Sequence, residues 1–255
     1  MKIVDLNSDL GESFGAYQIG QDEKILELIS SANIACGYHA GDHNVMAKTV
    51  KLAAEKDVSI GAHPGFPDLL GFGRREIQTS PEDIYHFVVY QISALKGFCQ
   101  INHVPLIHVK PHGALFNMAA KDPVMAEAIA TAVYDTDPSL VLFGLSGSEL
   151  IKAGLKAGLT VANEVFADRT YQPDGTLTPR TKSNAMIHDP LLAVEQVISI
   201  VKTGKVQAVD GSIVPLKADT ICVHGDSPNA LLFVEQLRDL LMKEGIQIKP
   251  VASLK

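Results

Sequence analysis

The sequence predicts an α/β fold, a (β/α) barrel formed by a single domain over residues 1–255. Short apolar runs alternate with helix-length segments whose apolar residues recur at helical spacing, a pattern typical of repeated βα units. The chain has 255 residues, of which 46% are hydrophobic, and it contains no linker or low-complexity stretch. One large core is therefore expected.

Seven apolar runs have the length and composition of parallel strands buried on both faces. They lie near residues 2–7, 32–37, 58–62, 106–110, 139–144, 159–165 and 219–224. A further run near 246–251 adds an eighth strand if it joins the same sheet. The barrel is therefore predicted to have seven strands, or eight with the last run.

Four helices are expected to begin at the same kind of capping pair, in which a Ser or Asp oxygen precedes a proline. These pairs are Ser80-Pro81, Asp122-Pro123, Asp189-Pro190 and Ser227-Pro228. Behind the first pair, apolar residues at helical spacing predict one buried face, formed by Ile84, Phe87, Val88, Ile92 and Leu95. Residues 64–79 and 166–189 are predicted to be long loops, and residues 205–217 a β-hairpin.

Composition excludes several classes of function. A net charge of −7, a pI near 5.7 and the absence of any Lys/Arg run argue against a nucleic-acid partner or an anionic membrane surface. No stretch reaches the ~18 unbroken apolar residues that a membrane span needs. Cys36, Cys99 and Cys222 lie far apart, which favours reduced thiols over a disulfide framework and predicts a cytoplasmic protein.

Polar residues follow most of the predicted strands. Because the active sites of (β/α) barrels lie at the carboxyl ends of the strands, these residues are expected to meet at one mouth. Imidazole and carboxylate groups together can deprotonate water and stabilise charge on an attacked carbonyl oxygen. The predicted catalytic residues are Asp9, His39, His63, Lys110, His112, Glu164, Asp168, Arg169 and His224.

A divalent metal site is one possible use of these residues. Asp9, His39 and His63 provide a carboxylate and two imidazoles from adjacent strands, although their spacing does not fix such a triad. His43 is expected to be a surface residue, because Gly41 separates it from His39 and no glutamate completes a helical zinc motif.

Two charged strand residues keep simpler structural interpretations. Lys110 could bind a carboxylate or phosphate, or form a salt bridge at the strand end. Asp5 lies within the first predicted strand and is expected to pair with a neighbour. The sequence contains neither a P-loop nor a Gly-x-Gly-x-x-Gly motif, so a nucleotide would have to bind in another way.

Several longer motifs resemble the LamB/YcsF family in the family's own order. These are Asp5–Glu12 (DLNSDLGE), Asn33–Asp42 (NIACGYHAGD), Gly61–Asp68, Gly71–Arg75 (GFGRR), Val109–Asn117, Glu164–Tyr171 and His224–Asp226. Where family members commonly carry Gly-Asp-Pro after the second strand, this sequence has Gly41-Asp42-His43.

The resemblance implies a seven-stranded barrel like that of the glycoside hydrolase/deacetylase superfamily. It also implies the A subunit of a prokaryotic ATP-dependent 5-oxoprolinase, which opens 5-oxoproline to L-glutamate together with separate B and C subunits. The cofactors expected are therefore ATP and, as a possibility from the residues, a divalent metal.

Roles for the predicted residues follow as hypotheses. Asp9, His39 and His63 would hold a metal or activate water directly. Other residues would steady the substrate carboxylate or phosphoryl group, namely Lys110 and Arg169. Proton transfer is assigned to Glu164 or Asp168, together with His224.

Two other functions remain open from the sequence. The chain could be a metal-dependent deacetylase or amidohydrolase that acts alone, or a non-catalytic subunit whose polar residues only stabilise loops.

Overall fold

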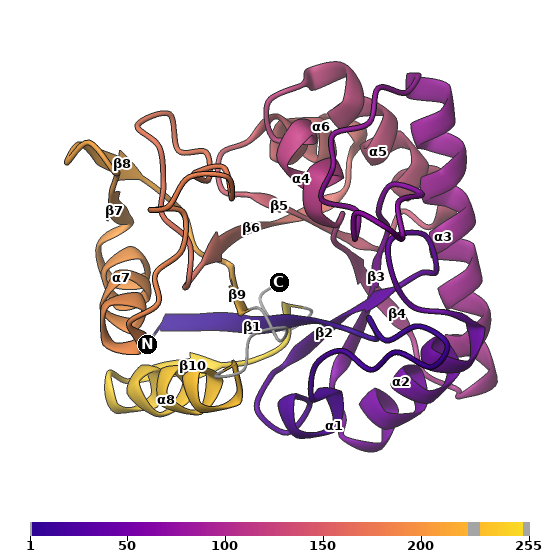
Figure 1. Ribbon diagram of the computed structural model, residues 1–255, viewed down its shortest axis with the longest axis horizontal. Coiled ribbons are helices and arrows are strands. Elements are labelled where there is room, and N and C mark those ends of the chain that lie inside the picture. The colour runs from indigo at the N-terminus through magenta and orange to yellow at the C-terminus, as the bar shows by residue number, and fades with distance from the viewer. Residues whose placement is uncertain (1, 224–229, 252–255) are drawn as a thin grey trace.

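The computed structural model describes residues 2–223 and 230–251 and confirms the (β/α) barrel. Its parallel strands form a closed ring of seven in the order β1-β2-β3-β4-β5-β6-β9, with β9 paired back onto β1. Figure 1 shows the ring with helices arranged around its outside. The ring strands are β1 (Lys2–Leu10), β2 (Ser31–Ala35), β3 (Ser59–His63), β4 (Leu106–Val109), β5 (Val141–Leu145), β6 (Thr160–Phe166) and β9 (Thr220–Val223).

The apolar run near 246–251 forms strand β10 (Ile246–Ile248), which does not enter the ring. It pairs in parallel with the first residues of β1, from Lys2 to Val4. Further along, β1 pairs with β9 and β2. Within the described residues β10 has no other strand partner, so the barrel keeps seven strands.

Helices cover the barrel between its strands. They are α1 (Asp22–Ile25), α2 (His43–Glu55), α3 (Pro81–Ile101), α4 (Gly113–Ala119), α5 (Pro123–Thr136), α6 (Glu149–Ala157), α7 (Pro190–Thr203) and α8 (Ala230–Lys243). As predicted, the side chains of Ser80, Asp122 and Asp189 accept hydrogen bonds from backbone amides at the starts of α3, α5 and α7. The fourth pair, Ser227-Pro228, lies outside the described residues.

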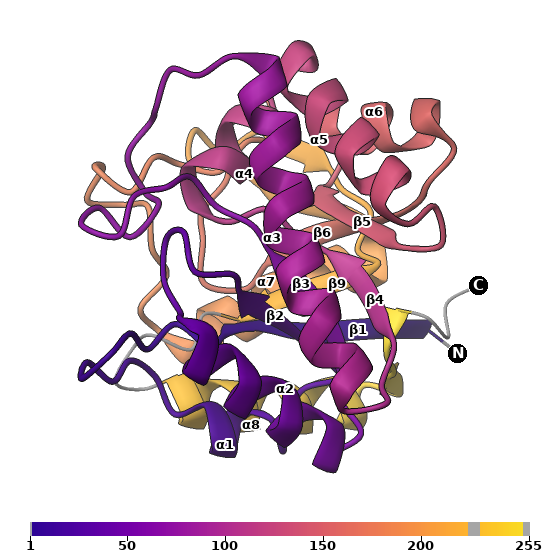
Figure 2. The ribbon, with the colours of Figure 1, turned by 90° about the vertical axis from the view of Figure 1, so that its right-hand side faces the viewer.

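The longest helix, α3, packs against the barrel through the predicted stripe. Its residues Ile84, Phe87, Val88, Ile92 and Leu95 are all buried. In Figure 2 this helix runs along the outside of the strands. Burial of the stripe explains why a helix with an exposed outer face is held in place.

The two predicted long loops lie where the strands end. Residues 64–80 connect β3 to α3, and residues 167–189 connect β6 to α7. Figure 2 shows both loops on the side of the molecule opposite the N-terminus. The predicted hairpin is also present, because β7 (Lys205–Gln207) pairs antiparallel with β8 (Ile213–Pro215).

Two further expectations concern the whole chain. Cys36, Cys99 and Cys222 are buried and form no disulfide. In residues 2–223 and 230–251, no helix has the length and apolar character required to cross a membrane.

Candidate functional site

Most of the predicted site residues lie together at the carboxyl end of the barrel. Asp9 lies near the end of β1, His63 is the last residue of β3, and Glu164 lies in β6. His39 follows β2. Lys110 and His112 follow β4. The closed ring therefore brings residues that are far apart in the sequence to one mouth.

Asn7, Glu164 and the partly exposed Asp9 surround the buried Lys110, and we call these four residues the charge network. The Lys110 ammonium donates to Asp9 Oδ1 at 2.9 Å and lies 3.0 Å from Glu164 Oε1. It also donates to Cys222 Sγ at 3.0 Å. Asn7 Nδ2 donates to Glu164 Oε1 at 2.9 Å. The lysine thus forms the strand-end salt bridge that the sequence left open.

Burial and neighbouring charges shift the pKa values of this network in opposite directions. Burial disfavours the ammonium, but the carboxylates of Asp9 and Glu164 outweigh it and raise the pKa of Lys110. Burial raises the pKa of Glu164, although the neighbouring Lys110 opposes that shift. Lys110 is therefore charged, and the carboxyl of Glu164 binds a proton more readily than usual.

Asp5 lies two residues before Asn7 in β1 and has a structural role, as expected. Its Oδ1 accepts from the hydroxyls of Ser30 and Ser31, at 2.8 and 2.6 Å. Its Oδ2 accepts from Thr220 Oγ1 at 2.5 Å. We call Asp5, Ser30, Ser31 and Thr220 the Asp5 group, and both of the Asp5 oxygens are hydrogen-bonded within it.

A second set of buried residues lies beside the charge network, and we call Glu12, His39, His63 and His112 the histidine cluster. One nitrogen or oxygen from each residue lies within 4.8 Å of those from the others. The His39 and His112 rings stack with their centroids 3.7 Å apart. Glu12 Oε1 lies 3.5 Å from His39 Nε2 and 3.7 Å from His112 Nδ1.

The hydrogen bonds of two of these rings determine which nitrogens carry protons. His63 Nδ1 lies 2.7 Å from the carbonyl oxygen of Lys110, and His112 Nε2 lies 2.8 Å from that of Phe72. Because a carbonyl can only accept, these two nitrogens must be the N–H donors. In the neutral rings, His63 Nε2 and His112 Nδ1 therefore carry lone pairs, and they lie only 2.9 Å apart.

Two facing lone pairs at this distance repel unless a positive charge lies between or beside them. Asp9 Oδ2 lies 3.3 Å from His63 Nε2 and adds further negative charge. Both ring nitrogens of His39 lack a hydrogen-bond partner among the described residues. Burial lowers the pKa of His39 and of His112, and neighbouring imidazoles lower both further. His39 and His112 therefore keep neutral rings, whose lone pairs are available to a ligand or a cation.

The donor set suits a divalent transition metal. Three imidazoles and a carboxylate are ligands that zinc and related ions accept, and the ring N–H to carbonyl bonds of His63 and His112 resemble the bonds that orient metal-binding histidines. The buried glutamate and three histidines could thus bind a metal. This set shares His39 and His63 with the predicted triad but contains Glu12 and His112, whereas Asp9 contacts both the cluster and Lys110.

The loop after β3 packs directly on the histidine cluster. A Cβ atom added to Gly65 would lie 2.6 Å from His39 Nδ1. At Gly73, whose φ is +61°, the added atom would lie 2.7 Å from His39 Cβ. These two glycines are therefore required for the close approach of the loop to the rings.

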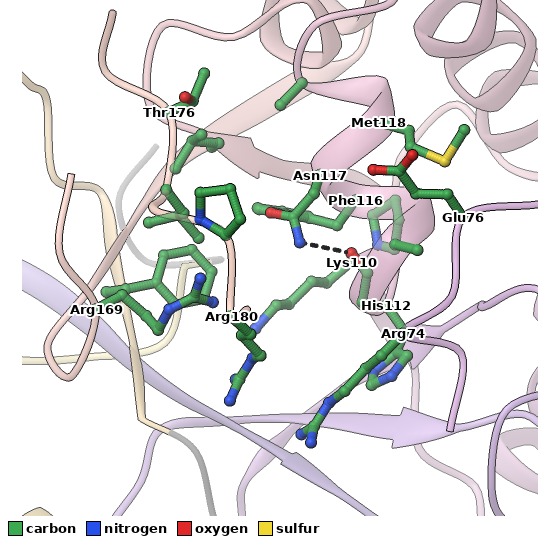
Figure 3. Close-up of a pocket in the computed structure, with 18 of the residues that line it drawn as sticks. Arg74, Glu76, Lys110, His112, Phe116, Asn117, Met118, Arg169, Thr176 and Arg180 are labelled. Atoms are coloured by element: carbon green, nitrogen blue, oxygen red, sulfur yellow. Dashed lines mark hydrogen bonds between the residues drawn. The ribbon is translucent and has the colours of Figure 1, made fainter. Parts of the chain in front are cut away.

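A cavity of about 730 Å³ adjoins both sets of residues. Asp9, Glu12, His63, Lys110 and His112 are among its lining residues. Figure 3 shows Lys110 and His112 beside Arg74, Arg169 and Arg180, which also line it. Its size is that of a small-molecule site.

The remaining predicted residues have other positions. Arg169 lines the cavity, but its guanidinium donates to the carbonyls of Thr178 and Ala185, at 2.6 and 3.3 Å. Burial and the nearby Arg180 lower the pKa of Arg169 to about 10. Asp168 is half-buried, lies near Arg169 and is not among the described residues that line the cavity. His224 lies outside the described residues.

Sequence reasoning missed Glu12, Arg74 and Arg180. Glu12 follows the end of β1 by two residues and closes the motif Asp5–Glu12, which was a usable signal. Arg74 lies in the GFGRR motif and Arg180 in the second long loop. Neither arginine follows a strand directly, so the strand-end rule did not select them.

The closed barrel and the buried imidazole and carboxylate groups at its mouth define a class of protein with a centre suited to proton transfer or metal binding. The chain belongs to the LamB/YcsF family, whose family model matches residues 4–255, and the resemblance seen in the motifs is confirmed.

Individual relatives agree with this assignment. A protein from Halalkalibacterium halodurans, named as the A subunit of 5-oxoprolinase, is 71% identical over 252 residues, which cover 99% of this chain and 98% of the relative. The crystal structure of the lactam utilization protein from Thermus thermophilus has a TM-score of 0.91 at 46% identity, covering 98% of this chain and 99% of that chain. A T48 deacetylase with substrate has a TM-score of 0.52 at 18% identity, covering 99% and 90%, which shows the fold alone.

Proposed function

We propose that this chain is the A subunit of an ATP-dependent 5-oxoprolinase, which opens the lactam of 5-oxoproline to L-glutamate. The names of the relatives support the substrate class, since one is named for 5-oxoprolinase and another for lactam utilization. One observation carries the proposal: the unprotonated nitrogens of His63 and His112 face each other 2.9 Å apart at the buried end of a small-molecule cavity. ATP and the B and C subunits follow from the family resemblance.

The chemistry requires activation of an unreactive amide. Transfer of the ATP γ-phosphoryl group forms an O–P bond at the lactam oxygen and releases ADP, which makes C5 electrophilic. Water adds to C5, the C5–N bond breaks, and the nitrogen takes up a proton to leave an amine and an acyl phosphate. A second water hydrolyses the acyl phosphate to glutamate and inorganic phosphate.

The role of accepting the proton of the attacking water is assigned to His63 and His112. Their other ring nitrogens are fixed by the carbonyls of Lys110 and Phe72, which leaves the facing nitrogens as the basic ones, and both residues line the cavity. Asp9 Oδ2 lies 3.3 Å from His63 Nε2 and would stabilise the imidazolium that forms. His39 stacks on His112 and holds the orientation of that ring.

Proton donation to the leaving nitrogen falls to Glu164, because burial raises the pKa of its carboxyl. Asp168 and His224 remain candidates for the same step. Lys110 is assigned a positioning role, since its ammonium already contacts Asp9 and Glu164. Arg169 is likewise assigned to its own loop, whose carbonyls its guanidinium binds.

If a divalent ion is held instead by Glu12, His39, His63 and His112, it would supply a Lewis acid at this centre, and His63 and His112 would act as ligands and not as bases. The predicted alternative uses Asp9 with His39 and His63. In both arrangements the chain's own residues orient the reactants.

The test is an assay of the purified chain with its B and C subunits, 5-oxoproline and ATP, in which glutamate, ADP and phosphate are measured. His63→Ala and His112→Ala should each lower glutamate formation about 10²- to 10⁴-fold, as expected for loss of a general base. His43→Ala is the matched control, because His43 is exposed at the start of α2. Wild-type rates in both folded cavity variants would contradict the proposal and favour a non-catalytic subunit.

The histidine cluster itself favours a second candidate, a metal-dependent amidohydrolase that acts without ATP or partners. Four convergent donors are sufficient for that chemistry. Hydrolysis of an amide or ester by the chain alone, dependent on one bound metal per chain and unaffected by ATP, would select this candidate. Strict dependence on ATP and on the partner subunits would reject it.

A further inference from the structure

Two arginines from different loops line the exposed part of the cavity, and neither has been given a role above. Arg74 lies in the loop between β3 and α3, and Arg180 lies in the loop between β6 and α7. Both residues are exposed. Figure 3 shows their side chains extending in the same direction, Arg74 beside His112 and Arg180 on the side of Arg169.

The first arginine is held close to the histidine cluster. The Arg74 guanidinium carbon lies 4.8 Å from the centroid of the Phe72 ring, a cation–π contact. The Phe72 ring packs edge-on against the rings of His39 and His112, and its centroid lies 5.8 and 5.4 Å from theirs. The backbone carbonyl of Phe72 accepts a hydrogen bond from His112 Nε2. A ligand group bound by Arg74 would therefore lie next to the candidate bases.

The second arginine, Arg180, lies in a loop segment that is held by hydrogen bonds from the buried side chain of Arg169. The guanidinium of Arg169 donates to the carbonyls of Thr178 and Ala185, which flank Arg180 in the sequence. Arg169 is 3% exposed, so a buried charge is used to hold this segment in place. Its effect is to present Arg180 to the cavity.

The positive charges act on one another across the cavity. Arg180 and Arg74 both lower the pKa of Arg169, after burial, and Arg74 also contributes to the lowered pKa of His39 and His112. Guanidinium groups gathered in this part of the cavity favour an anion bound directly beside them, although Glu12, Glu76 and Asp122 also line the cavity.

We propose that Arg74 and Arg180 form a clamp for an oxyanion carried by the reactant, either the carboxylate of 5-oxoproline or a phosphoryl group. A guanidinium presents paired N–H donors that match both groups. The inference rests on the proposed function for the identity of the reactant and extends it by naming the residues that bind its charge. Arg169 acts in the clamp as a positioning residue for Arg180.

The test is calorimetric titration of the purified chain with three probes: L-5-oxoproline, 2-pyrrolidinone, which lacks the carboxylate, and inorganic phosphate. The wild-type chain should bind 5-oxoproline at least about tenfold more tightly than 2-pyrrolidinone, or bind phosphate. Arg74→Ala and Arg180→Ala should each weaken the binding of that anion about 10- to 100-fold, as expected for charge-assisted hydrogen bonds. Arg74→Lys should recover only part of the loss, because lysine cannot bind in a bidentate manner.

Lys182→Ala is the matched control, since Lys182 is an exposed cation in the same loop and does not line the cavity. Thermal unfolding of each variant checks that it is folded. Dependence on the carboxylate would identify the substrate as the source of the oxyanion, and dependence on phosphate would identify the phosphoryl group. Equal anion binding by the wild-type chain and both alanine variants, or no anion binding by the wild-type chain at millimolar concentration, would overturn the clamp.

Failure of the clamp is distinguishable from failure of the proposed function. If the assembled complex forms glutamate and the double variant Arg74→Ala/Arg180→Ala keeps the wild-type KM for 5-oxoproline and ATP, the clamp is wrong and the function stands. If phosphate binding depends on both arginines but no glutamate forms, the proposed function is wrong and the clamp stands.

Discussion

Two sets of buried polar groups lie side by side in this barrel, and they differ in how completely their hydrogen bonds are satisfied. In the Asp5 group, both oxygens of Asp5 accept hydrogen bonds from neighbouring hydroxyls. In the histidine cluster, His39 has no hydrogen-bond partner on either ring nitrogen among the described residues. Both Asp5 and His39 are almost fully buried, at 0% and 1% exposure.

Burial alone therefore does not distinguish a structural polar residue from a functional one. A buried group whose donors and acceptors are all used stabilises the fold and leaves no site for a ligand. A buried group with unused lone pairs costs free energy unless a ligand or cation completes it. The charge network is intermediate, because Lys110 is fully engaged while Glu164 Oε2 has no hydrogen-bond partner in the described part of the chain.

The largest expected effect comes from breaking the charge network. Lys110→Met keeps the length of the side chain but leaves the carboxylates of Asp9 and Glu164 buried without their cation. We expect the free energy of unfolding to fall by about 3–5 kcal/mol, the cost of removing one partner from a buried ion pair. Urea denaturation measures the change.

Lys152→Met is the control for Lys110→Met, because Lys152 pairs with Glu149 at the surface of α6. Surface pairs contribute about 0–1 kcal/mol, so this variant should be close to wild type. If Lys110→Met lowers the free energy of unfolding by less than about 1 kcal/mol, the buried ion pairs of Lys110 do not stabilise the fold as proposed.

The second prediction tests whether the histidine cluster is completed by a metal. Glu12→Gln should weaken binding of a divalent probe such as Co²⁺ about 100-fold, because it replaces a charged oxygen ligand by a neutral one. The visible absorption of bound Co²⁺ and the metal content after dialysis measure the affinity without reference to activity.

Asp9→Asn distinguishes between the two candidate metal sites, the histidine cluster and the triad of Asp9, His39 and His63 predicted from the sequence. If the cluster of Glu12 and three histidines is the site, Asp9→Asn should reduce Co²⁺ affinity less than Glu12→Gln does. The opposite order would favour Asp9, His39 and His63 as the ligands. His43→Ala, which removes an exposed histidine, should leave the affinity unchanged.

The third prediction uses His108, a buried histidine that belongs to neither set. Its ring stacks on Phe143 with centroids 4.2 Å apart, and its Nε2 donates to Asn33 Oδ1. Burial lowers the pKa of His108 to about 3. In the unfolded chain this ring takes up a proton near its ordinary pKa of about 6.5, whereas the folded chain does not. Stability should therefore fall as the pH drops below about 6.5.

The expected contribution of His108 between pH 6.5 and pH 5 is about 2 kcal/mol, from about 1.4 kcal/mol per pH unit. The raised pKa values of Asp5 and Glu164 act in the opposite direction, so the comparison is between variants and not along one curve. His108→Gln should lose about 2 kcal/mol less than wild type over this range, measured by urea denaturation at both pH values. Parallel curves for the two proteins would show that folding does not lower the pKa of His108.

Much of the fold could be predicted because its signals are local. The capping pairs at Ser80, Asp122 and Asp189 and the stripe on α3 depend on residues within one or two turns of each other. Strand β10 shows the limit of local reasoning. Its apolar run was visible, but whether it enters the ring depends on which strand it pairs with, and the sequence does not show that.

The candidate site could be predicted in part. The strand-end rule brought Asp9, His63 and Lys110 to one mouth because parallel strands share a direction. It could not assign their partners. The tautomers of His63 and His112 depend on two backbone carbonyls, and the role of Arg169 depends on the carbonyls of its own loop, so residue types alone do not encode them.

The smallest expected effect comes from the Asp5 group. Ser31→Ala removes one of the two hydroxyls that donate to Asp5 Oδ1, and Ser30 still donates to the same oxygen. Because no acceptor is left without a partner, we expect the free energy of unfolding to fall by only about 1 kcal/mol, the net value of one hydrogen bond. Urea denaturation measures this loss, and Co²⁺ affinity should be unchanged, since the group is separate from the histidine cluster. A weakened Co²⁺ site in Ser31→Ala would show that the two sets are coupled and that their difference in hydrogen bonding does not divide structure from function.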